Sequence, residues 1–245
     1  MANNLLFLII SFGASVVGAI CGIGGGVIIK PVLDFFRVAD VAAISFLSGC
    51  TVLSMSCYSV VKNLSTGESR VNMKTGTPLA LGGAVGGILG KQLFSSVKAA
   101  FASPNTVGAV QAACLAALTV GTLIYTINKN RIRTKQVSNL IVCLIIGLAL
   151  GILSSFLGIG GGPFNLVILF FFFSMDTKTA AQNSLYIILF SQITSLLTTL
   201  LTHSVPDFQW IALFLWSLAE SSAELSAGKQ TKRWMKKRLI NCLLF

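Results

Sequence analysis

The chain has few of the side chains on which metal sites, disulfide frameworks and most enzymes depend. Only 7 of its 245 residues are acidic, and its single histidine, His203, falls in a short loop without a partnered serine. Because a nucleophile needs a base beside it, neither an intramembrane protease nor an acyltransferase is indicated. The six cysteines form no C-x-x-C pair, so a disulfide framework or a metal site has no support. No Walker motif occurs, which argues against a P-loop ATPase within this chain.

Apolar side chains are abundant instead. Hydrophobic residues make up 54% of the chain and charged residues 10%, and apolar stretches of about 18 to 22 residues recur, the length that crosses a bilayer. The net charge of +11 comes from Lys and Arg in a few loops and a tail, as the positive-inside rule expects, so nucleic-acid binding is not indicated. No basic segment precedes the first apolar run, which we therefore expect to be retained rather than cleaved as a signal peptide. The composition predicts an all-α, multi-pass protein of the cell membrane, without a cofactor.

The apolar runs fall into two similar series. The first contains a long element over 5–36 that glycines interrupt, followed by clean spans near 41–61, 77–94 and 105–127. The second contains an interrupted element over 138–174, followed by spans near 179–202 and 208–227 and by a basic tail. We therefore divide the chain into a first transmembrane repeat (1–128), a cytoplasmic linker (129–137) and a second transmembrane repeat (138–245).

A duplicated pentapeptide relates the two series. The sequence GIGGG at 22–26 recurs unchanged at 158–162, an interval of 136 residues. At the same interval Asp40 matches Asp176, and Ser48 matches Ser184. Such agreement indicates internal duplication, with two homologous halves that each start with a broken or re-entrant helix pair.

The basic residues indicate that the halves are inverted. The loop 62–74 has three basic residues and one acidic residue, whereas its counterpart 203–207 has no Lys or Arg. The linker 129–135 has four basic residues and the tail 229–238 has six. Placing all three segments in the cytoplasm puts equivalent loops on opposite sides and requires each glycine element to be a hairpin. The short second arms, 27–36 and 163–174, agree with this, whereas Lys91 and Lys98 count against it.

The glycine segments are candidate sites for an anion. Consecutive glycines leave peptide N–H groups uncovered, and a short helix is expected directly after each segment, with Pro163 at the first position of the second. A helix N-terminus carries partial positive charge and free donors, and secondary transporters bind substrate at such broken helices. Spacing of the G-x-x-x-G type also permits close helix packing without a ligand, and this alternative stays open. The candidate residues are Gly24, Gly25, Gly26, Gly160, Gly161 and Gly162.

Other polar residues in apolar surroundings extend this candidate site. Lys30 could add a full charge, or could instead snorkel or pair with Asp34. Asn165 follows the second glycine segment closely, at a position where a lipid-facing helix would not carry an amide. The following spans carry stripes of Ser and Thr that could line a solute path or join helices. The candidates in these stripes and at their entrance are Ser48, Asn183 and Ser184, while Ser45, Ser191 and Ser195 belong to the same stripes.

A second glycine pattern has a structural interpretation. Gly82, Gly86 and Gly90 repeat every four residues, with Gly83 and Gly87 beside them. Glycine on one face of a helix allows another helix to approach its backbone. We therefore expect tight helix packing along this span, without a ligand.

The paired motifs resemble those of the TauE/SafE permeases, also called the sulfite exporter or anion permease family. The resemblance rests on GIGGG followed by a short apolar helix with Pro31, and on GIGGGP at the start of the second half. It implies a multi-pass transporter of small anions, often sulfur-containing, such as sulfite, thiosulfate or a sulfonate. Carried over residue by residue, the family motif falls on Gly22, Gly24, Gly25, Gly26, Gly158, Gly160, Gly161, Gly162 and Pro163.

The second half departs from this pattern at its end. The span 105–127 has no counterpart, because only 239–245 follows the basic tail. The chain is thus similar to a family member that lacks its final helix, whose exposed face a second copy or a partner helix would cover. We expect a secondary transporter for a small anion that works by alternating access, and not an enzyme. The alternatives are a non-transporting membrane subunit or a truncated, inactive family member.

Overall fold

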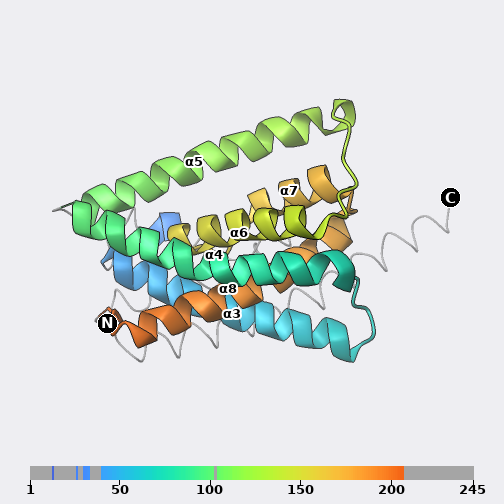
Figure 1. Cartoon of the computed structure of the whole chain (residues 1–245). Helices are drawn as coiled ribbons and strands as arrows, with labels where there is room; N and C mark the ends of the chain where they lie inside the picture. Colours follow the sequence, from blue (N-terminus) through green and yellow to red (C-terminus); the bar gives the residue numbers. More distant parts are fainter. Residues whose placement is uncertain (1–12, 14–25, 27–29, 34–39, 102–103, 207–245) are drawn as a thin grey trace.

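The computed structural model describes residues 13, 26, 30–33, 40–101 and 104–206, and these residues are helical or lie in short connections, without a strand among them. The all-α prediction is confirmed for this part of the chain (Figure 1). Its elements are α3 (Val41–Ser65), α4 (Met73–Ala100), α5 (Pro104–Asn128), the 3-10 turn η1 (Lys129–Arg131), α6 (Leu140–Leu157), α7 (Pro163–Phe173) and α8 (Thr177–Leu201).

Four of the described helices are long and apolar enough to cross a membrane. They are α3, residues 106–128 of α5, α6 and α8. Helix α4, which we also predicted as a span, has 28 residues but is not among the four. Its glycines lower its hydropathy, because they take positions that large apolar side chains occupy in the other helices.

The glycines of α4 let it lie between α6 and α8 at backbone contact. A Cβ atom added at Gly86 would meet the backbone of α6: it would lie 2.9 Å from Ile152 N and closer still to Leu148 O. One added at Gly87 would meet Ser191 O and Thr194 Oγ1 of α8. The tight packing predicted for this span is therefore confirmed, and it engages two faces of α4.

Helices α6 and α7 form a hairpin around the second glycine segment. Helix α6 ends at Leu157 and is capped by Gly158, which is in the left-handed conformation at φ 66°; Gly160, Gly161 and Gly162 also have positive φ. Pro163 then begins α7, at a position where its missing N–H costs no helical hydrogen bond. The end of α7 returns to the start of α6, since the linker residues Lys135 and Val137 donate to Phe171 O and Phe172 O at 2.7 and 2.9 Å. The predicted break and return of the element 138–174 are confirmed, whereas most of 5–36 lies outside the described residues.

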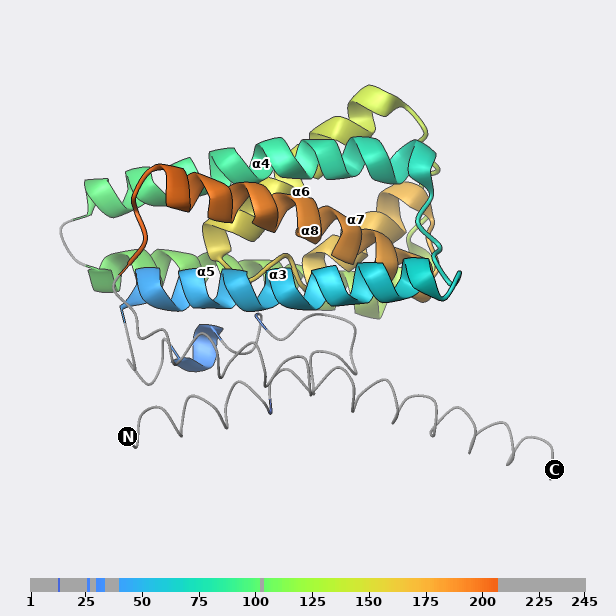
Figure 2. The same cartoon turned by 90° about the horizontal axis from the view of Figure 1, so that it is seen from below.

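Helices α3 and α8 are an antiparallel pair of equal length. Each has 25 residues, and each follows an aspartate, Asp40 or Asp176. The side chain of Asp176 accepts from the N–H groups of the first turn of α8, whereas that of Asp40 makes no such bond. Figures 1 and 2 show the two helices crossing the molecule in opposite directions.

The α3–α4 loop is attached to the first turns of α8. Gln182 Nε2 donates to Glu68 O at 3.1 Å, and Gln182 Oε1 accepts from Arg70 N. The Arg70 guanidinium also lies 3.7 Å from the Asp176 carboxylate. The Gln182 side chain therefore provides hydrogen-bond partners for two backbone groups of this loop, the Arg70 N–H and the Glu68 carbonyl.

Basic side chains gather at one end of the molecule. This basic end comprises the loop 66–72, the linker 129–139 and the connection 174–176, which the hydrogen bonds above hold together (Figure 1). Lys62, Arg70, Lys74 and the four basic linker residues lie at this end, compared with two acidic residues, Glu68 and Asp176. The loop 202–206 lies at the opposite end and contains no Lys or Arg. Two of the three segments that we assigned to the cytoplasm thus share one end, and the third, 229–238, lies outside the described residues.

Candidate functional site

The two copies of the glycine motif meet in the interior. A Cβ atom added at Gly26, in the first copy, would lie 2.9 Å from Ile159 O in the second and 3.0 Å from Ser48 Oγ of α3. The rest of the first candidate set, Gly24 and Gly25, lies outside the described residues. Residues 158–162, which we call the glycine turn, are all buried. Together with Gly26 and Ser48 they form one neighbourhood between α3, α6 and α7.

The glycine turn packs closely against α3. A Cβ atom added at Gly160 would overlap the side chain of Val52, and one at Gly158 would lie 3.0 Å from Ser45 Cβ. Positive φ and close neighbours therefore require glycine here on structural grounds alone. The packing interpretation of the motif gains direct support, while its role as a ligand site stays a prediction.

Asn165 is the polar side chain nearest the turn on α7. It is fully buried at 0% exposure, and its Nδ2 donates to Ser184 Oγ of α8 at 3.3 Å. Its side chain lies against Gly161. Asn165 Oδ1 and Ser48 Oγ are buried without a hydrogen-bond partner in the described part of the chain. Most buried polar atoms are hydrogen-bonded, and these are two of five exceptions in the described residues, so each has a free position for a further hydrogen bond near the turn.

Lys30 is also buried, and its ammonium lies at the C-terminal end of α6. Nζ donates to Leu157 O at 2.6 Å, to Gln111 Oε1 of α5 at 2.7 Å and to Ser45 Oγ of α3 at 2.7 Å. Gln111 Nε2 in turn donates to Phe156 O. With 3% exposure the side chain does not snorkel; Asp34, the other suggested partner, lies outside the described residues. The last carbonyls of a helix lack intrahelical partners and carry partial negative charge, and Lys30 and Gln111 satisfy two of them.

The remaining predicted residues divide between two places. Ser184 contacts Asn165, close to the turn. Asn183 lies at the basic end instead, where Nδ2 donates to Thr179 O at 2.8 Å and to Arg70 O at 3.4 Å. Further along α8, Ser191 and Gln192 bond to serines of α6. These bonds join helices, which is the second of the two roles we considered for the polar stripe.

Gln111 is a site residue that we did not single out. It is an isolated amide in an apolar span, and an amide there is costly unless it has partners. The sequence therefore contained a signal that Gln111 has a buried partner. It did not identify Lys30 as that partner, because the two residues are 81 positions apart.

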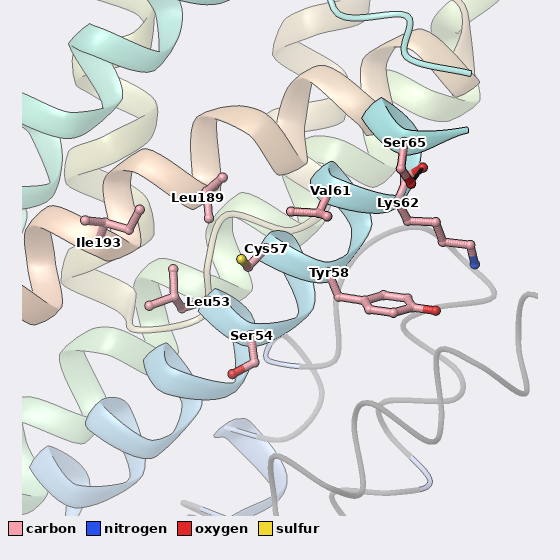
Figure 3. Close-up of a pocket in the computed structure, with 9 residues that line it drawn as sticks. All are labelled: Leu53, Ser54, Cys57, Tyr58, Val61, Lys62, Ser65, Leu189 and Ile193. Carbon is pink, nitrogen blue, oxygen red and sulfur yellow. Dashed lines mark hydrogen bonds between the residues drawn. The ribbon is translucent and has the colours of Figure 1, made fainter. Parts of the chain in front are cut away.

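A separate groove is lined by residues of α3 and α8 (Figure 3). Its volume is about 800 Å³, and none of the predicted site residues lines it. Lys62 Nζ lies 5.4 Å from the centre of the Tyr58 ring at one end, and the rest of the lining is mainly apolar. In the described ranges no group of three His, Cys, Asp or Glu side chains could hold a metal ion.

Membrane-length helices, together with a buried hairpin turn where polar groups converge, define a helical membrane protein with an internal polar neighbourhood. The chain belongs to the sulfite exporter TauE/SafE family, whose family model matches residues 7–245. This is a family of membrane transporters. No curated protein and no solved structure matches the chain.

Proposed function

We propose that this protein is a secondary transporter of the cell membrane that moves a small anion by alternating access. The family is the first support, since it suggests a membrane sulfite exporter or permease. The glycine turn is the second, because it places a helix N-terminus inside the protein. The substrate we favour is a small sulfur-containing anion such as sulfite, thiosulfate or a sulfonate.

The charges around the turn favour an anion. Two helix ends meet there: the C-terminus of α6, with partial negative charge, and the N-terminus of α7, with partial positive charge. An anion is attracted by the N-terminus of α7 and repelled by the C-terminus of α6. Lys30 lies on the α6 carbonyls and offsets that repulsion. The position of the buried Lys30 ammonium beside the turn is the single observation that carries the proposal.

We further infer that the halves are inverted repeats and that the anion binds at their interface. The support is the pair α3 and α8: they have equal length, start at the interval of the glycine motifs and run antiparallel. The close approach of Gly26 to Ile159 O supports this inference, since the two residues belong to different copies of the motif. Secondary transporters built from inverted repeats bind substrate between them. The basic end then faces the cytoplasm.

Counterflow of labelled sulfite, thiosulfate and taurine in proteoliposomes tests the proposal. We expect uptake of at least one anion by the wild-type protein and its loss in Asn165→Leu, which removes the amide beside the turn at similar volume. The control is Gln192→Leu, which removes a buried amide of α8 that bonds to Ser154 and not to the turn. Folded wild-type protein without uptake of any of these anions would contradict the proposal and favour a non-transporting family member.

A further inference from the structure

We propose that the described structure contains a buried site for a monovalent cation and that the ammonium group of Lys30 occupies it. Its ligands among the described residues are the oxygens of Leu157, Gln111 and Ser45, which we call the oxygen site. They come from α6, α5 and α3, and each lies 2.6 to 2.7 Å from Lys30 Nζ. Lys30 is thus a tethered ligand rather than a side chain that reaches the surface.

The oxygen site has the chemistry that such cations require. A backbone carbonyl, an amide carbonyl and a hydroxyl provide hard oxygen ligands. The backbone carbonyl, Leu157 O, lies at the C-terminal end of α6, which carries partial negative charge. The site is largely shielded from solvent, because Lys30 and Gln111 are 3% and 2% exposed, and its Ser45 side is only partly buried. Hydrogen bonds from an ionised donor are stronger than neutral ones, and short distances are typical of them.

Gln111 holds the oxygen site in place. Its amide donates through Nε2 to Phe156 O, which fixes the direction in which Oε1 accepts from Lys30. One side chain of α5 therefore bonds both to the last turn of α6 and to the cation. The arrangement joins three helices at the Lys30 ammonium, directly before the glycine turn.

Two consequences go beyond the proposed function. The turn needs no dissolved sodium or potassium ion to neutralise the end of α6, because the chain supplies its own cation. Removal of the Lys30 side chain should leave oxygens that accept a small cation from solution. Both consequences concern folding stability in the absence of any transported anion.

Chemical rescue tests the oxygen site. Purified Lys30→Ala protein is unfolded thermally in chloride salts of ammonium, methylammonium, potassium or tetramethylammonium at equal ionic strength. We expect its Tm in tetramethylammonium to fall by roughly 5–10 °C below wild type, since charge-assisted bonds are lost. Ammonium, methylammonium or potassium should restore a substantial part of this loss. The wild type and Lys74→Ala, which lacks an exposed lysine of α4, should unfold at the same temperature in all four salts.

A Lys30→Ala protein that is folded but equally stable in all four salts would overturn the proposal. If this variant does not accumulate, Gln111→Leu and Ser45→Ala provide the test, because each keeps Lys30 and removes one oxygen. Each should then lower the Tm by several degrees relative to the wild type, whereas Ser54→Ala, an exposed serine of α3, should not. Unchanged stability in both variants would equally refute the oxygen site. Neither outcome depends on whether the protein transports an anion.

Discussion

The contact between α4 and α6 allows a quantitative prediction for Gly86→Ala. An added Cβ would lie 2.9 Å from Ile152 N and 3.0 Å from Gly151 Cα, and closer still to Leu148 O. All three are backbone atoms, so no side chain can rotate away and the two helices must separate. Overpacking of this kind costs about 1–3 kcal/mol, and the contacts with backbone place this variant near the upper limit. The better helix propensity of alanine offsets at most about 1 kcal/mol.

We therefore expect Gly86→Ala to lose about 2 kcal/mol of stability, which corresponds to a Tm lower by roughly 4–8 °C. Thermal unfolding of the detergent-purified protein, followed by the loss of the monodisperse peak in size-exclusion chromatography, measures this. Gly121→Ala is the matched control, because Gly121 lies within α5 and an added Cβ would have no neighbour within 4 Å. Its Tm should be unchanged or slightly higher. If both variants unfold at the wild-type temperature, the close approach of α4 and α6 is refuted.

Three further predictions concern the turn, the topology and pH. Gly160→Ala should lower the Tm and abolish uptake, because its φ of 73° strains a side chain by about 1–2 kcal/mol; a stable, active variant would contradict the described turn. In a background without native cysteines, Glu68→Cys and Ser204→Cys should react with a membrane-impermeant maleimide from opposite sides, and labelling from one side would exclude the topology. A hydrogen bond from Thr179, with smaller backbone and charge effects, lowers the pKa of Asp176 below its usual 3.8. The stabilisation by the ionised Asp176 carboxylate is therefore present above pH 3.8 and is lost as the pH falls through the lowered pKa. Asp176→Asn should weaken this acid dependence in thermal unfolding between about pH 5 and pH 2, and an unchanged pH profile would refute the assignment.

Much of the helical architecture could be predicted from local patterns. The expected span 179–202 agrees closely with α8 (Thr177–Leu201), because its apolar run and the preceding Asp176 are both local signals. The break in 138–174 was equally predictable, since three consecutive glycines disfavour a helix and the Pro163 that follows them cannot donate a helical hydrogen bond. Glycines four residues apart indicated the packed face of α4 for the same kind of reason.

The partners within the site could not be predicted. Lys30 was expected near the turn, but its bonds to Gln111 and Leu157 join residues far apart in sequence. Such pairs depend on how α5 lies against α6, and a hydropathy pattern does not contain that information. Asn183 shows the same limit, because it is adjacent to Ser184 in sequence yet bonds to the α3–α4 loop. Side chains of consecutive helical residues point in directions about 100° apart, so adjacent residues can contact different neighbours.

The hydrogen bonds made by Gln182 restrict the motion of α8 relative to the loop 66–72. They fasten the loop 66–72 to α8, and the bonds of Lys135 and Val137 likewise fasten the linker to α7. At the other end, the described bonds of His203 and Ser204 reach only residues of the same turn. Separating the helices at the basic end therefore requires breaking bonds between segments distant in sequence, whereas the described bonds of 202–206 impose no such cost. If the basic end faces the cytoplasm, as proposed above, Gln182→Ala should favour the form that is open towards the cytoplasm, because it removes two of these bonds.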